Sequence, residues 1–86
     1  MENEKNEYYQ LGYQLSNVQG ANKLNYLLTQ QFKQYDIIID IILKMAITKG
    51  ISMPVGFVTD IKKNGKEYYF LTLGLTNGII ENRNKK

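Results

Sequence analysis

The chain has 86 residues, of which 43% are hydrophobic and 22% charged, and its formal net charge is +3. These proportions are typical of a folded domain and lie outside the range of disordered sequences. The absence of both His and Cys excludes disulfides, thiolate nucleophiles, catalysis by histidine and the commonest zinc ligands. We therefore expect a protein that is not an enzyme, with no metal site and no cofactor.

The two ends of the chain are polar. Residues 1–7 are acidic and no apolar run follows them, so we predict a flexible terminus and no secretory signal. The longest apolar run is interrupted by Asp40 and is too short to span a bilayer. We expect a cytoplasmic protein without a membrane partner, with one domain over residues 8–82 and a flexible basic tail over residues 83–86.

Before residue 50 the apolar residues recur mostly every three or four positions, which is the spacing of amphipathic helices. One or more helices are therefore predicted within residues 8–49. We expect interruptions at Gly20 and near Gln30, because glycine destabilises a helix interior and the apolar stripe skips at the glutamine. Ser16 followed by Gln19 has the spacing of a capping box, which would start a second helix.

Residues 8–15 also fit a different structure. Tyr9, Leu11, Tyr13 and Leu15 alternate with small or polar residues, which is the period of a half-buried strand. Helix and strand both remain open for this segment.

Residues 33–49 are the most apolar segment and contain six isoleucines. The polar residues at its start and middle are Lys33, Asp36, Asp40 and Lys44. They lie three or four positions apart, so a helix here has one narrow polar strip and buries its other sides. Lys49 and Gly50 predict the end of this helix, because a cation and a glycine are both favoured at helix C-termini.

Asp36 and Asp40 lie one helical turn apart, a spacing at which two carboxylates can share a divalent cation or an acid–base task. The same helix offers no further oxygen ligand. We therefore predict ion pairs instead, between Asp36 and Lys33 and between Asp40 and Lys44.

After Pro54 the pattern changes. Residues 55–61 and 67–73 are rich in β-branched and aromatic side chains, and Asn64-Gly65 between them favours a two-residue type I′ turn. These features predict an antiparallel hairpin that is apolar on both faces near its base.

A second Asn-Gly pair, Asn77-Gly78, would turn the chain so that Ile79 and Ile80 form a third strand. The predicted fold class is therefore α+β, with two or three helices followed by an antiparallel β-hairpin or a three-stranded meander. One small copy has more apolar faces than it can cover, so we predict a homo-oligomer, either a dimer or a larger assembly.

The predicted hairpin has a basic tip, in which Lys63 faces Lys66. The candidate contact residues for nucleic acid or a protein partner are Lys62, Lys63, Asn64 and Lys66 at the tip and Arg83 in the tail. Lysines in a turn can bind phosphates, as the wing of a winged-helix domain does. The alternative is a solvated turn whose charges prevent the strand edge from pairing with other chains.

Five tyrosines form a second candidate surface for a partner or a ligand: Tyr8, Tyr9, Tyr13, Tyr68 and Tyr69. Tyrosine rings stack on bases and anchor protein interfaces. The alternative is a half-buried position in the core with the hydroxyl at the rim.

These features together predict a small non-catalytic binding protein. Asn, Ile, Lys and Tyr, whose codons are AT-rich, are abundant, which favours a phage- or plasmid-type regulator or inhibitor. It would hold a macromolecular partner as a homo-oligomer. One alternative is a nucleic-acid-binding protein that uses the tip formed by Lys62, Lys63 and Lys66, and another is an oligomer that sequesters a small ligand.

Overall fold

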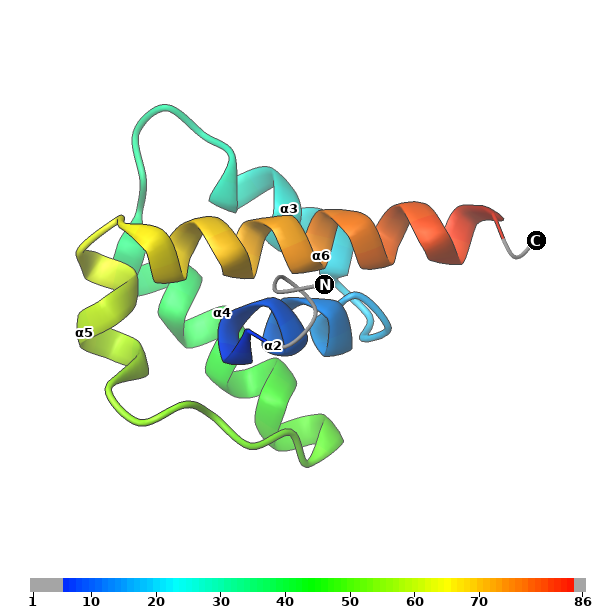
Figure 1. Ribbon diagram of the computed structural model, residues 1–86, viewed down its shortest axis with the longest axis horizontal. Coiled ribbons are helices and arrows are strands. Elements are labelled where there is room, and N and C mark those ends of the chain that lie inside the picture. The colour runs from blue at the N-terminus through cyan, green and yellow to red at the C-terminus, as the bar shows by residue number, and fades with distance from the viewer. Residues whose placement is uncertain (1–5, 85–86) are drawn as a thin grey trace.

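The computed structural model describes residues 6–84, and every regular element within this range is an α-helix (Figure 1). The helices are α2 (Glu7–Leu15), α3 (Ala21–Leu28), α4 (Tyr35–Lys49), α5 (Phe57–Lys62) and α6 (Lys66–Asn84). Helix α6 runs the length of the molecule, and its C-terminal turns extend beyond the other helices (Figure 1). It packs most extensively on α2 and also contacts α3 and α5.

Residues 8–15 are helical, which settles the choice left open by the sequence. The side chain of Asn6 caps α2 by accepting hydrogen bonds from the backbone N–H groups of Tyr8 (2.9 Å) and Tyr9 (3.2 Å). The cap satisfies two of the N–H groups that a helix start leaves without a partner. Tyr8, Leu11 and Leu15 are buried at the three- and four-residue spacing of a helix.

The interruptions between the first helices lie where the sequence predicts them. Gly20 precedes α3 with a φ of 96°, and Gln30 lies in the connection between α3 and α4. The predicted capping box is wrong. Ser16 ends α2, and its hydroxyl donates a hydrogen bond back to the carbonyl of Tyr13 at 2.5 Å. A serine hydroxyl can hydrogen-bond to the unpaired backbone groups at either end of a helix. The spacing of Ser16 and Gln19 therefore does not show which end of a helix lies there.

The isoleucine-rich helix is confirmed as α4. Ile38 and Ile42 are fully buried in its inner face. The predicted C-terminus is also confirmed, because α4 ends at Lys49 and Gly50 adopts a left-handed conformation with a φ of 67°. The N–H of Ile51 then donates a hydrogen bond to the carbonyl of Ala46 at 2.9 Å, which closes the helix end.

The predicted hairpin is wrong. Residues 55–61 form the turn before α5 and most of α5, and residues 67–73 form the first half of α6. The connection of residues 63–65 joins two helices. Of the Asn-Gly pair, Asn64 has a positive φ of 50° and Gly65 does not, so the backbone lacks the two left-handed residues of a type I′ turn.

The predicted third strand is wrong for a related reason. Asn77, Gly78, Ile79 and Ile80 all lie inside α6. The buried residues of this helix form one stripe at helical spacing that crosses both predicted strands: Tyr68, Leu71, Gly74, Leu75, Gly78 and Ile79. Burial of this stripe outweighs the local preference of aromatic and β-branched residues for strands. The fold described by residues 6–84 is therefore all-helical, and the α+β class is a wrong prediction.

Helices α2 and α6 approach so closely that their backbones nearly touch. A Cβ atom added to Gly74 would lie 2.1 Å from the carbonyl oxygen of Tyr9, and one added to Gly12 would lie 2.2 Å from the carbonyl oxygen of Leu71. Only glycine fits at these positions. The contact fixes which side of α6 is buried and turns the opposite side outward.

The core is one cluster to which every helix contributes. Its largest fully buried side chains are Leu15, Leu24, Leu28, Ile38, Ile42, Ile61, Leu71 and Leu75. Within residues 6–84, no buried side-chain nitrogen or oxygen lacks a hydrogen-bond partner. No helix in this range has the length and apolarity needed to cross a membrane.

The two predicted tails are partly described. Asn6 and Glu7 lie at the start of α2, while Arg83 and Asn84 lie in the last turn of α6. The rest of both predicted tails lies outside the described residues.

Candidate functional site

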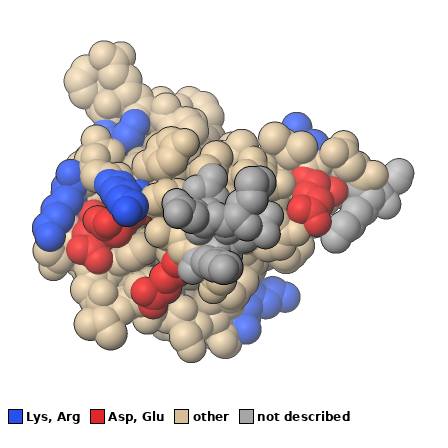
Figure 2. Space-filling view, viewed as in Figure 1, with Lys and Arg blue, Asp and Glu red and all other residues tan. Residues whose placement is uncertain are grey.

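The predicted basic tip is present as the turn between α5 and α6. All of its candidate residues are exposed there: Lys62, Lys63, Asn64 and Lys66. Figure 2 shows basic side chains gathered at this end of the molecule with acidic ones between them. The Lys62 ammonium lies 3.3 Å from the Asp36 carboxylate, and the Lys63 ammonium lies 3.9 Å from that of Asp60. These carboxylates partly neutralise the turn.

Arg83 is not part of this cluster. It lies seventeen residues beyond Lys66 along the same helix, which corresponds to about 25 Å at 1.5 Å per residue. The structure therefore separates the predicted basic residues into a lysine turn and a distant arginine.

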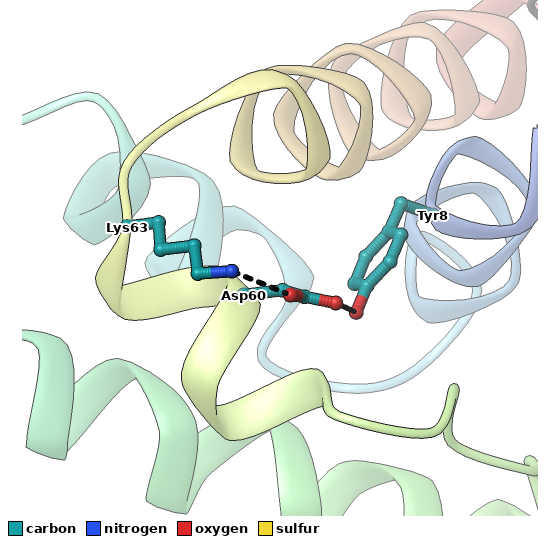
Figure 3. A network of polar contacts seen from close by, with 3 residues as sticks. All are labelled: Tyr8, Asp60 and Lys63. Atoms are coloured by element: carbon teal, nitrogen blue, oxygen red, sulfur yellow. Dashed lines mark hydrogen bonds and ion pairs between the residues drawn. The ribbon is translucent and has the colours of Figure 1, made fainter.

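Tyr8 is a structural residue. Its hydroxyl donates a 2.7 Å hydrogen bond to Asp60, which also faces Lys63 (Figure 3). Its ring stacks on Phe57 with a centroid distance of 6.4 Å. Burial and the hydrogen bond to Asp60 both raise the pKa of Tyr8 above its ordinary value. The residue joins α2 to α5 and offers no surface to a partner.

Tyr68 is also a core residue. Its hydroxyl donates a 2.6 Å hydrogen bond to the carbonyl of Leu28, which ties α6 to the end of α3. Its ring meets that of Tyr35 edge to face at 6.1 Å. Burial, with a smaller contribution from Tyr35, raises the pKa of Tyr68 to about 12. For Tyr8 and Tyr68 the core interpretation is the correct one.

Tyr9 and Tyr13 are half-buried on the outer side of α2. Their rings stack at a centroid distance of 6.4 Å, and the Asn77 amide donates a 3.1 Å hydrogen bond to the Tyr9 hydroxyl. A hydrogen bond to Glu81 is the main cause that raises the pKa of Tyr13. The surface hollow here has a volume of about 380 Å³ and is lined by Tyr9, Gln10, Tyr13, Gln14 and Glu81.

Tyr69 belongs to a surface that the sequence patterns do not predict. It is 59% exposed and lies on the side of α6 opposite the buried residues Leu71 and Leu75. We define the outward face of α6 as Lys66, Tyr69, Phe70, Leu73, Asn77 and Ile80, all of which are exposed or half-buried. Their spacing of three or four residues is visible in the sequence, but the predicted hairpin assigned them to two faces of a sheet.

The outward face begins with an aromatic group. The rings of Tyr69 and Phe70 meet at 69° with a centroid distance of 5.5 Å. The Lys66 ammonium lies 5.9 Å from the centroid of the Phe70 ring, within the range of a cation–π contact.

The two aspartates of α4 are bound by lysines. The predicted pair of Asp40 with Lys44 is confirmed at 2.9 Å. The predicted pair of Asp36 with Lys33 is wrong, because Asp36 pairs with Lys62 of α5 and the Lys33 ammonium donates to the carbonyl of Gln30. Sequence spacing gives only partners on the same helix, whereas α5 packs beside α4. Within residues 6–84, no group of three His, Cys, Asp or Glu residues could hold a metal ion.

Large apolar side chains are also exposed away from α6. The most exposed are Phe32 (82%), Ile47 (80%) and Val55 (99%). Phe32 is followed by Lys33 at the edge of a second hollow of about 570 Å³, which is lined by Lys33, Gln34, Tyr35, Asp36, Ile37 and Lys62.

Comparison with known proteins assigns no family to the chain. No family model matches it, and neither a curated protein nor a solved structure matches it. The function therefore has to be inferred from the surfaces described above.

Proposed function

We propose that this chain is a non-catalytic binding protein that forms homo-oligomers and holds a macromolecular partner, as a small regulator or inhibitor does. The observation that carries the proposal is the exposure of large apolar side chains on surfaces whose shape the fold fixes. Scattered exposed apolar residues are ordinary in proteins. Here they follow one helix face on α6, and at the start of α4 Ile37 lines a hollow whose first lining residue, Lys33, follows Phe32 in the sequence. Covering them with another surface is favourable by about 25 cal/mol for each Å² of apolar area.

The side-chain chemistry supports a binding role over a catalytic one. The sequence has neither His nor Cys. The carboxylates of Asp36, Asp40 and Asp60 each lie within ion-pair distance of a lysine.

The proposed partner surface lies at the start of α4. Phe32 extends from the α3–α4 connection as an aromatic side chain that is 82% exposed. Ile37 is 48% exposed, and Lys33 and Lys62 line the hollow beside it. Binding energy in interfaces concentrates at aromatic anchors with charged groups at the rim, and this surface has that composition.

Photo-cross-linking tests the proposal. A benzophenone side chain at position 32 should give one discrete adduct in lysate of the source cells, and Ile37→Glu should remove it because a charge then enters the apolar contact. The matched control carries the same group at Thr48, which is exposed and polar. The proposal fails if positions 32 and 48 give the same adducts, or if Ile37→Glu changes nothing.

One observation favours nucleic acid as a second candidate partner. Lys62, Lys63 and Lys66 are exposed around the three-residue connection between α5 and α6. Lys62 ends α5, Lys63 lies in the connection and Lys66 begins α6, and such short connections occur in helix-turn-helix domains. Three phosphate contacts would give a slope of about −2.7 in a plot of log K against log salt, at about 0.9 per contact.

Fluorescence anisotropy with duplex DNA and with single-stranded RNA tests this candidate. Changing Lys62, Lys63 and Lys66 together to Ala should weaken binding and flatten its salt dependence. The matched control changes Lys23, Lys44 and Lys49 to Ala, which removes the same charge elsewhere on the surface. Equal losses in both variants, or no binding at about 50 mM salt, exclude a nucleic-acid site at the turn.

A further inference from the structure

The outward face of α6 is mostly apolar, with one charged residue at its start and another beside its far end. Tyr69, Leu73 and Ile80 follow one another within about 40° around a helix that advances 100° per residue. Tyr69 is 59% and Ile80 is 49% exposed. Lys66 stands at the first residue of the helix, and Glu81 stands beside the far end of this face. The face therefore has a cation at one end and a carboxylate at the other.

These two charges run against the dipole of their own helix. The N-terminal end of a helix carries partial positive charge and favours acids, whereas the C-terminal end favours cations. Glu67 and Arg83 follow this rule in the first and last turns of α6. Lys66 and Glu81 reverse it. Lys66 lies on the outward face, and Glu81 lies on the flank between this face and α2, where it lines the hollow with Tyr9 and Tyr13. A cation at the start of a helix and an acid near its end are unfavourable for that helix alone. They become favourable beside an antiparallel copy, because each charge then lies next to the opposite charge and the opposite end of the other helix dipole.

We propose that α6 pairs in antiparallel orientation with α6 of a second copy of this chain, with Lys66 of each copy against Glu81 of the other. The inference rests on the proposed homo-oligomer and names its surface. The midpoint between Lys66 and Glu81 lies between Leu73 and Gly74, so Leu73 meets Leu73 at the two-fold axis. A parallel pair would instead place like charges together.

The same register also places the remaining residues of the outward face opposite groups on which they can pack. The aromatic pair Tyr69 and Phe70 lies opposite Asn77 of the second copy, where rings can pack on the amide. Each Lys66 also reaches the negative end of the other helix. Tyr13 donates a hydrogen bond to Glu81, and a carboxylate accepts several such bonds, so this contact is compatible with an ammonium partner.

The length of the outward face determines how strongly the two copies are expected to bind each other. Lys66 and Glu81 are about 22 Å apart along the helix. Two aligned helices in contact over that length make an interface at the small end of the specific ones. We expect a reversible dimer with a dissociation constant in the micromolar range.

Disulfide trapping tests the register, because the chain contains no cysteine of its own. Leu73→Cys should form a covalent dimer on mild oxidation, since a disulfide needs Cβ atoms about 4 Å apart. Ile80→Cys is the matched control on the same face. In the antiparallel register the two copies of position 80 lie about 20 Å apart and should stay unlinked.

A charge exchange tests the pairing without a cysteine. Lys66→Glu and Glu81→Lys should each weaken the dimer about 10-fold, and the two changes in one chain should restore it to within about 3-fold of the wild type. Circular dichroism confirms that each variant remains helical.

The outcomes separate the register from the proposed function. A covalent dimer from Leu73→Cys with restoration by the double exchange supports the proposal. Equal linking of Ile80→Cys shows a parallel pair and overturns it. A wild-type chain that light scattering shows to be larger than a monomer, without linking at Leu73, associates through another surface. This overturns the register and leaves the homo-oligomer intact. If the wild-type chain is still a monomer at about 200 μM, both the antiparallel register and the proposed homo-oligomer are wrong.

Discussion

At the residue scale, Gly74 controls the distance between α2 and α6. We expect Gly74→Ala to destabilise the protein by about 2–4 kcal/mol, because the new methyl group would overlap the backbone of α2 and force the helices apart. The carbonyl oxygen of Tyr9 lies 2.1 Å from the position of the added Cβ. Urea unfolding followed by circular dichroism measures the loss.

The matched control is Gly65→Ala, since nothing lies within 4 Å of a Cβ added there and Gly65 has no positive φ. Its stability should stay within about 1 kcal/mol of the wild type. If both variants lost the same free energy, the close approach of α2 and α6 would not be the cause.

Because the Tyr68 phenol is buried, we expect the protein to lose stability at alkaline pH. Its pKa is raised from the ordinary value of 10.0 to about 12, mainly by burial. The folded state therefore favours the neutral phenol, and the stabilisation that this gives is complete below pH 10 and is lost as the pH rises through about 12. The free energy of unfolding of the wild type should fall across this range by an amount on the order of 2 kcal/mol.

The control for Tyr68 is Tyr68→Phe, which should be less stable at neutral pH by about 1 kcal/mol through loss of the hydrogen bond to Leu28. Its stability should fall less steeply above pH 10. Some slope should remain, because the pKa of Tyr8 is raised as well. Parallel pH profiles for the two proteins would show that Tyr68 does not titrate in a buried site.

At the element scale, the backbone conformation of the turn between α5 and α6 distinguishes the observed fold from the predicted hairpin. Asn64 adopts a φ of 50°. We expect Asn64→Val to cost about 1–2 kcal/mol, because a β-branched side chain is strained in the left-handed region. Asn64→Gly should leave the free energy of unfolding within about 0.5 kcal/mol of the wild type.

Gly65→Ala distinguishes the two folds in the same assay. A type I′ hairpin turn needs positive φ at both central residues, so an alanine at position 65 would be costly there. In the helix–turn–helix connection Gly65 has no such need. A large loss from Gly65→Ala would support the hairpin and contradict the structure.

The helices that could be predicted from the sequence are those whose signals act locally. Helix α4 has a dense apolar stripe and ends at Gly50, and both features depend only on neighbouring residues. Helix α6 could not be predicted, because its aromatic and β-branched residues favour strands locally, and the Asn-Gly pairs before it and within it favour hairpin turns. Its helical state depends on packing against α2, which brings Gly74 and Gly78 to backbone and side-chain atoms of a distant segment.

At the scale of the whole molecule, the candidate site was predictable only where its residues are neighbours in sequence. Lys62, Lys63 and Lys66 lie together in any compact turn. The roles of Tyr8 and Tyr68 were not predictable, because their hydrogen-bond partners lie 52 and 40 residues away. The outward face of α6 was not predictable from the sequence. A strand places alternate residues on opposite faces, whereas a helix brings residues three or four positions apart to one face.

The apolar surface of the whole molecule is the reason to expect association. Ile37, Ile47 and Ile80 remain about half exposed or more in one copy, although eight other large apolar side chains are fully buried. A fold of this size gains substantially by covering such residues with a second copy or a partner.

Sedimentation equilibrium of the purified wild type, between about 1 and 200 μM, tests the central claim most directly. We expect the weight-average mass to rise from that of one chain toward that of two, and Leu73→Glu, which puts a charge in the middle of the outward face of α6, to shift this rise to at least about 10-fold higher concentration. A wild-type mass that stays at one chain over the whole range would contradict the claim that the exposed apolar surface drives self-association.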